Sequence, residues 1–294
     1  TLTLSNGATA SYTSGSGSTA LVFTYTVVEG HADSGNLSVS SYSGTIKNTA
    51  GNTASPTSGD LGTVIIDANS PAFQSVNAPD NTYKVGDDVN ITVTWSQTVE
   101  VTGTPTLILS NSTSASYTSG TGSAALIFTY TVAEYDNNSQ DLSVSSYSGT
   151  ITDAAGNTAA AASGSLGSVI IDGNSPIFSS VAAADGTYKV GDQIPITMTW
   201  NQDVVNGTAG NEPTLTLSNG ATASYTSGTG SAALIFTYTV AEDDNNSQDL
   251  SVSSYSGTIA DVAGNNASYP GDVGLGAVII DANSPAFQSV NAPD

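Results

Sequence analysis

Apolar and polar residues alternate along much of the chain. Residues 89–95 read V-N-I-T-V-T-W, so the four apolar side chains that end at Trp95 share one face and the polar side chains share the other. Residues 126–132 alternate in the same way, as L-I-F-T-Y-T-V. Period two among β-branched and aromatic residues predicts strands with one buried face. We find no convincing helical period, so the pattern predicts an all-β fold.

The chain also repeats itself. Residues 65–80 read IIDANSPAFQSVNAPD and recur unchanged as residues 279–294, while residues 170–176 read IIDGNSP. Equivalent aspartates therefore stand at Asp67, Asp172 and Asp281, with spacings of 105 and 109 residues. Such a period is too long for a solenoid unit and is typical of a whole β-sandwich domain repeated in tandem.

One full repeat, residues 70–174, divides at its turn-rich stretches into seven predicted strands. We place strands A to G at residues 72–77, 88–96, 105–110, 114–118, 124–133, 142–151 and 166–171. Seven short alternating strands in a domain of this length match an immunoglobulin-like sandwich. The predicted fold class is therefore all-β, with tandem seven-stranded immunoglobulin-like β-sandwiches in a linear array.

The repeats predict four segments. Residues 1–69 form a partial repeat that lacks its first two strands, residues 70–174 and 175–283 are complete repeats, and residues 284–294 are the first strand of a further repeat. Because the chain opens at strand C of one repeat and closes after strand A of another, we expect it to be a segment of a longer array.

Composition excludes several functions. The chain of 294 residues has 25 acidic residues against three lysines and no arginine, which gives a net charge of −22. Nucleic-acid binding and binding to anionic membranes both depend on cationic side chains, so neither is expected. No apolar run is long enough to insert directly into a membrane. Without cysteine there is neither a disulfide nor a thiolate site, and one histidine offers no histidine pair for catalysis. We therefore expect no enzyme.

The acidic residues gather in loops and linkers. Successive strands of a sandwich run in opposite directions, so the E–F loop of one repeat and the F–G loop of the next should meet at the linker between them. The first junction is expected to hold Glu29, Asp33, Asp67, Asn69, Asp153 and Asn157. The second is expected to hold Glu134, Asp136, Asp141, Asp172, Asn174, Asp261 and Asn265. The matching residues after the third repeat are Glu242, Asp244, Asp249, Asp281 and Asn283.

These side chains offer only hard oxygen and amide groups, and calcium takes six to eight oxygen ligands of that kind. Bound Ca²⁺ would also offset the self-repulsion of so many carboxylates. Plainer interpretations stay open: Asp-x-Ala-Gly-Asn is also a turn motif, the linker Asp and Asn can cap chain ends, and the E–F acids can be a solvated loop. His31, Lys84 and Lys189 are expected to be surface residues.

The ordered set of motifs resembles a known family. Strand B is followed by TPTLTLS-like strand C, A-x-Y-T-S-G, L-x-F-T-Y-T-V, D-L-S-V-S-S, G-T-I-x-D-x-A-G-N and I-I-D-x-N-S-P. This order is similar to the bacterial Ig-like tandem repeat in the extender region of large secreted, calcium-binding surface adhesins. The resemblance covers the whole chain. It implies an extracellular location on the bacterial cell surface, a role in adhesion or biofilm formation, and further copies of the repeat as partners.

Two functions are compatible with these observations. The first is a structural extender or stalk, rigidified by calcium at its junctions, in a surface adhesin or an extracellular filament that can contact neighbouring fibres or cell surfaces. The second is a repeated binding module that contacts glycan, ice or another cell directly. The near-identity of the repeats favours the extender, because a spacer needs copies of one domain.

Overall fold

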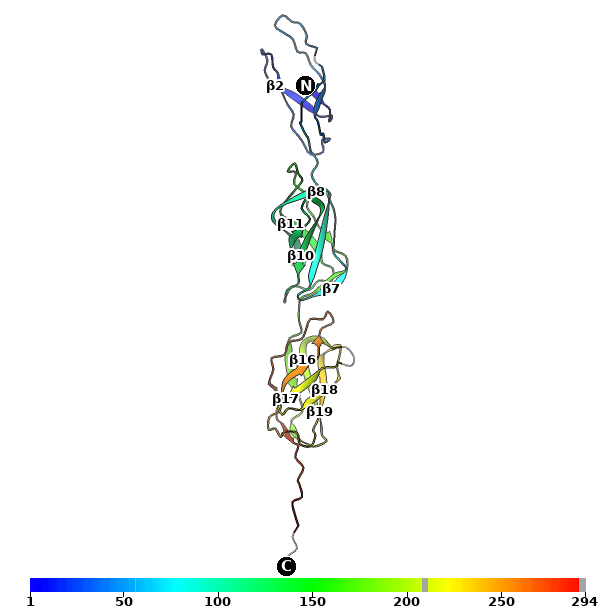
Figure 1. The fold of residues 1–294 in the computed structure, drawn as a ribbon, viewed down its shortest axis with the longest axis vertical. Coiled ribbons are helices and arrows are strands. Elements are labelled where there is room, and N and C mark those ends of the chain that lie inside the picture. The colour runs from blue at the N-terminus through cyan, green and yellow to red at the C-terminus, as the bar shows by residue number, and fades with distance from the viewer. Residues whose placement is uncertain (56, 208–210, 291–294) are drawn as a thin grey trace, which may run out of the picture. The chain divides into compact units, whose positions relative to one another are not determined.

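A computed structural model of the protein describes residues 1–55, 57–207 and 211–290. Every regular element within these ranges is a β-strand, and Figure 1 accordingly shows arrows and no coiled ribbon. The predicted all-β fold is thus confirmed. The same ranges contain no helix with the length and apolar character that crossing a membrane requires.

Contacts along the chain define two compact units. Unit 1 comprises Thr1–Pro79, Asn90–Tyr130 and Ser143–Gly167, and unit 2 comprises Asp80–Val89, Thr131–Leu142 and Ser168–Asp294. Unit 1 contains the linker after the first repeat, and unit 2 contains the linker after the second. The four-segment division inferred from the repeats stays a prediction.

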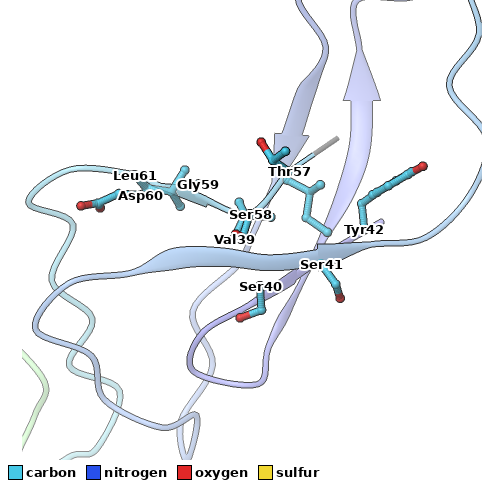
Figure 2. A pocket seen from close by; sticks show the side chains of 10 residues that line it. Val39, Ser40, Ser41, Tyr42, Thr57, Ser58, Gly59, Asp60 and Leu61 are labelled. Carbon is cyan, nitrogen blue, oxygen red and sulfur yellow. The ribbon is translucent and has the colours of Figure 1, made fainter. Parts of the chain in front are cut away.

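The first repeat, in unit 1, is a single sheet with the strand order β3-β2-β1-β4-β5. Its strands are β1 (Leu2–Leu4), β2 (Thr9–Ser14), β3 (Val22–Thr24), β4 (Ser38–Tyr42) and β5 (Gly59–Asp60). Its buried core is small and consists of Leu4, Ala10, Leu37, Ile66 and Ala68. A hollow of about 450 Å³ opens on this sheet, and Figure 2 shows Val39, Tyr42 and Leu61 around it.

The remaining strands of unit 1 form one sheet with the order β10-β9-β8-β11-β12, and β6 pairs with β8. They are β6 (Phe73–Asn77), β8 (Asp88–Leu109), β9 (Ser114–Ser119), β10 (Ser123–Thr131), β11 (Ser143–Thr152) and β12 (Gly164–Ser165). The prediction of separate strands B and C was wrong, because β8 spans both. The segment between them stays in the ladder, where Glu100, Val101 and Thr102 pair with β11.

Unit 2 begins with a parallel pair that the sequence did not predict. In it, β7 (Asn81–Lys84) lies beside β13 (Val169–Asp172), the last strand of its repeat, with Tyr83 opposite Ile171. Strand β7 has only four residues, N-T-Y-K, which is too short a run to show an alternating pattern.

The third repeat is described almost completely and forms a sandwich. Its strands are β14 (Phe178–Ala182), β15 (Gly186–Lys189), β16 (Gln193–Asn206), β17 (Thr214–Leu217), β18 (Thr222–Ser227), β19 (Ser231–Thr239), β20 (Ser251–Ser256), β21 (Ile259–Ala260), β22 (Val273–Gly274) and β23 (Val278–Asp281). The order in the main sheet is β14-β16-β19-β18-β17-β20-β22, β21 pairs with β16, and β15 pairs with β23 in parallel. Strand β18 joins the two layers of the sandwich, since it pairs with both β19 and β17.

The alternating pattern sets the core of this sandwich. Trp200 on β16, Phe236 on β19, Leu215 on β17 and Val252 on β20 belong to one buried cluster, so the two layers face each other across a common core. Within unit 1, Trp95 is likewise buried, and its Nε1 donates to the backbone oxygen of Ala160 at 3.1 Å. The inward orientation predicted for both tryptophans is confirmed.

Candidate functional site

The first linker, residues 67–71 in unit 1, is bound by the E–F loop that precedes it. Glu29 accepts two hydrogen bonds from Ser70, at 3.0 Å from the backbone N and at 2.7 Å from Oγ. Oδ1 of Asp33 accepts from the backbone N of Ala68 and from Nδ2 of Asn69, both at 2.8 Å. These carboxylates therefore act as acceptors for the N–H and O–H groups of the linker.

The F–G loop of the following repeat binds the same linker from its carbonyl side. Nδ2 of Asn157 donates to the backbone oxygen of Asp67 at 3.2 Å. Nε2 of Gln97, on β8, donates to the backbone oxygen of Asn69 at 2.8 Å. The linker is thus held by two groups of side chains: acids take its N–H groups and amides take its C=O groups.

Asp153 orients both amides. Its Oδ2 accepts from Nε2 of Gln97 at 3.0 Å and from Nδ2 of Asn157 at 2.9 Å. Its Oδ1 accepts from the backbone N of Ala155 at 3.0 Å and of Asn157 at 2.9 Å, which closes the Asp-x-Ala-Gly-Asn turn. Asp153 as a whole is only 5% exposed. Asp-x-Ala-Gly-Asn is therefore both a turn and part of the linker site: Oδ1 of Asp153 closes the turn, and Oδ2 orients the two amides that bind the linker.

The second linker, residues 172–176 in unit 2, repeats this arrangement. Nδ2 of Asn265 donates to the backbone oxygen of Asp172 at 3.1 Å, and Nε2 of Gln202 donates to that of Asn174 at 2.9 Å. Asp261, 5% exposed, accepts from Gln202 at 3.2 Å and from Nδ2 of Asn265 at 2.9 Å. Its Oδ1 accepts from the backbone N of Gly264 and of Asn265, each at 2.8 Å.

The E–F side of the second linker differs in one residue. Glu134 binds Ser175 through its backbone N at 2.9 Å and its Oγ at 2.7 Å, as Glu29 binds Ser70. Asn138 takes the place of Asp33: its Oδ1 accepts from the backbone N of Gly173 at 2.8 Å and from Nδ2 of Asn174 at 2.9 Å. Nδ2 of Asn138 donates to Oδ1 of Asp172 at 3.0 Å.

The loop between β7 and β8 adds a further contact in unit 2. The backbone N of Val85 donates to Oδ1 of Asn265 at 2.8 Å. Lys84 packs its stem over the turn at Gly264, where an added Cβ would lie 3.4 Å from its Cδ. The ammonium of Lys84 lies 3.7 Å from Asp87, and its side chain is 40% exposed against 80% for the equivalent Lys189. Lys84 is thus a surface residue, as expected, whose stem lies over a neighbouring loop.

At the end of the third repeat the acidic side of the site appears again. Glu242 binds the backbone N of Ser284 at 2.9 Å and its Oγ at 2.7 Å. The hydrogen bond from the backbone N of Ser284 is the main cause, and the one from its Oγ adds to it: together they hold the pKa of Glu242 below its usual value. Oδ1 of Asn246 accepts from the backbone N of Ala282 at 2.8 Å, while Oδ1 of Asp281 lies 3.5 Å from Nδ2 of Asn246.

Several predicted site residues have other places. Asp136 and Asp244 close their own E–F loops by accepting from the backbone N of Ala133 and Ala241, both at 2.8 Å. Asp141, Asp249 and Asn283 are exposed and make none of the linker contacts described above.

His31 occupies the position of Asp244. Its Nδ1 lies 2.8 Å from the hydroxyl of Tyr25, as Oδ2 of Asp244 lies 2.8 Å from that of Tyr238. Burial, and then the hydrogen bond to Asp244, raises the pKa of Tyr238 to about 12. His31 is therefore a half-buried loop residue that makes the tyrosine contact that Asp244 makes in the third repeat.

The described residues do not form a carboxylate cage. None of their His, Cys, Asp and Glu side chains gather in a group of three or more that could hold a metal ion. The junction acids Glu29, Asp33, Asp153 and Asp261 instead use their oxygens as acceptors for N–H and O–H groups. Calcium, by contrast, takes six to eight oxygens around one ion. Calcium at the junctions stays a prediction.

Sequence reasoning missed part of the site. The two glutamines and Asn138 contact a linker, and the serine of each N-S-P motif is the linker residue that binds a glutamate; none of them was proposed. A signal existed for the glutamines, since each stands two residues after a repeated tryptophan, in T-W-S-Q and T-W-N-Q. The sequence alone did not reveal the role of this motif, because a glutamine in a Ser- and Thr-rich chain shows no particular chemistry until its hydrogen-bond acceptors are known.

Comparisons with known proteins give little beyond this geometry. No protein-family model matches the chain, and no curated protein matches it either. Among solved structures, a fragment of the I-band of titin is similar, with 12% sequence identity and a TM-score of 0.33 over 84% of this chain and 74% of that one.

Proposed function

We propose that this chain is a structural spacer, a stalk segment in which linkers of fixed geometry join β-sandwich repeats. The observation that carries the proposal is the recurrence of one linker arrangement. In each unit, a glutamate binds the serine of N-S-P and two amides bind the carbonyls two residues apart. A catalytic site needs one special repeat, whereas a spacer needs the same joint each time.

The wider setting of this spacer is part of the proposal. An array of such repeats would serve as the extender of a large adhesin on the bacterial cell surface, or of an extracellular filament, with a role in adhesion or biofilm formation. Its partners would be further copies of the same repeat and, at a distance, neighbouring fibres or cell surfaces. The resemblance of the motif order and the strongly acidic surface support this setting, since a net charge of −22 keeps such a chain soluble.

The alternative, direct binding of glycan or ice by the outward strand faces, has less support. Outward threonines are paired with each other across the sheet, as Thr118 with Thr129 at 2.8 Å and Thr226 with Thr237 at 2.7 Å. Each pair commits one hydroxyl hydrogen internally, which leaves fewer donors for a ligand. Glycan-array binding or thermal hysteresis by the purified chain would favour this alternative.

Orientation measurements test the spacer directly. Residual dipolar couplings report the orientation of each part of the chain. Within unit 1, the residues before and after the first linker should share one alignment tensor, and within unit 2 the same should hold for the residues before and after the second linker. Independent alignment of the two sides of a linker would refute the proposal. Calcium is not needed for this test, which is run first in EDTA.

A further inference from the structure

We infer that Gln97 and Gln202 are positioning residues that lock each linker without a metal ion. Together with the buried aspartate and the Asn of the Asp-x-Ala-Gly-Asn turn, each glutamine forms what we name the amide clamp: Gln97, Asp153 and Asn157 in unit 1, and Gln202, Asp261 and Asn265 in unit 2. The inference rests on the proposed function and specifies how the joint is fixed.

Each glutamine follows a buried tryptophan on the same strand. Gln97 follows Trp95 by two residues, so both side chains leave the strand on the same side. Trp95 is buried and is fixed by its hydrogen bond to Ala160. Trp200 is fixed in the same way, with Nε1 3.3 Å from the backbone oxygen of Ser268. The core tryptophan therefore sets where the glutamine amide meets the linker.

The hydrogen bonds leave only one orientation for this amide. Nε2 of Gln97 faces two acceptors, the linker oxygen of Asn69 and Oδ2 of Asp153. A flipped amide would place its oxygen against both, so the donor orientation is fixed. The same holds for Gln202 between Asn174 and Asp261. The clamp thus fixes the direction of the N–H groups that bind the linker as well as their distance from its carbonyl oxygens.

The buried carboxylate of the clamp is satisfied by N–H groups alone. Asp153 accepts from two backbone and two side-chain N–H groups, and Asp261 does the same. Charge-assisted hydrogen bonds of this number stabilise a buried anion without a cation. A cation at these oxygens, or at the linker carbonyls, would meet the hydrogens already directed at them. The joint should therefore keep its geometry when metal ions are removed.

Distance measurements on the full chain test this. The protein has no cysteine, so pairs of introduced cysteines can carry nitroxide labels. Exposed Ser11 and Ser116 lie in unit 1 on either side of the first linker, and exposed Thr82 and Ser227 lie in unit 2 on either side of the second. Each pair reports the width of one distance distribution by pulsed dipolar spectroscopy.

Gln97→Met keeps the length of the side chain and removes its donors. We expect it to broaden the first distribution by about twofold while the second keeps its width, because a hinge of few residues is released. Gln202→Met should do the reverse, so each variant controls for the other. Gln140→Met, at an exposed glutamine in an E–F loop, should change neither. EDTA and calcium chloride should leave the widths of the parent protein equal.

The outcomes separate this inference from the proposed function. Broad distributions in the parent protein under both conditions would refute the spacer itself. A narrow parent with equally narrow Gln97→Met and Gln202→Met variants would refute the clamp and leave the spacer standing. Broadening of the parent by EDTA would show that a metal ion, not the clamp, fixes the joint. An unchanged melting temperature in the variants would show that the effect is on orientation rather than on folding.

Discussion

Replacing Asp261 by alanine should destabilise the third repeat far more than replacing any exposed acid. Asp261 is 5% exposed, and its carboxylate accepts four hydrogen bonds, from two backbone N–H groups and from the amides of Gln202 and Asn265. The substitution removes all four acceptor contacts at once and leaves the donors in a site where little water reaches them.

The magnitude follows from these contacts. Each buried donor that is left unsatisfied costs about 1–3 kcal/mol. Two effects reduce the total: some of the four donors will bind water instead, and the variant no longer buries a charge. We therefore expect the free energy of unfolding to fall by about 3 kcal/mol. For a domain of this size, that lowers the melting temperature by roughly 10–20 °C.

Tryptophan fluorescence provides the assay. The chain has two tryptophans, so a Trp95→Phe background leaves Trp200 as the reporter of the third repeat during urea unfolding. Asp249→Ala is the matched control, because Asp249 is an exposed acid of the same repeat. If Asp261→Ala and Asp249→Ala agree within about 0.5 kcal/mol, a typical surface effect, the clamp carboxylate does not stabilise the fold as argued.

Three further outcomes are expected. If calcium binds the junctions, millimolar calcium, about ten times a dissociation constant of 10⁻⁴ M, should add about 1.4 kcal/mol per site, and equal protection by sodium chloride at matched ionic strength would contradict that prediction. Because folding lowers the pKa of Glu242, its ionised form stabilises the folded state at a pH above the pKa of the unfolded chain, and this stabilisation is lost as the pH falls through the pKa of the folded state. An NMR titration of Glu242 should show the lowered pKa, and Ser284→Ala should shift it back upward. Tyr238, whose pKa is about 12, should titrate last in an ultraviolet titration, and its stabilising effect should fall as the pH rises from about 10 through 12. Tyr238→Phe should remove that late step and cost about 1 kcal/mol, and an unchanged ultraviolet profile would contradict the assignment.

The sequence by itself determined which residues face the core. Strand side chains alternate by geometry, so a period of two is visible in any window, and Trp95 and Trp200 are buried as that period requires. Repetition likewise identified the linker motif and placed acids of the E–F loop and the Asp-x-Ala-Gly-Asn turn beside it. These are local or periodic properties, and they need no knowledge of contacts across the fold.

Tertiary structure decided what those acids do. Counting charges made cations the obvious counterpart for 25 acidic residues and three lysines, because a sequence displays its side chains but not its backbone N–H groups. Once folded, Glu29 meets the N–H of Ser70 and Asp153 meets two backbone and two amide N–H groups. The same applies to Gln97, whose two acceptors lie 28 and 56 positions away along the chain. Hydrogen bonds over such separations depend on how the strands are brought together, and the local pattern of residues carries no record of that.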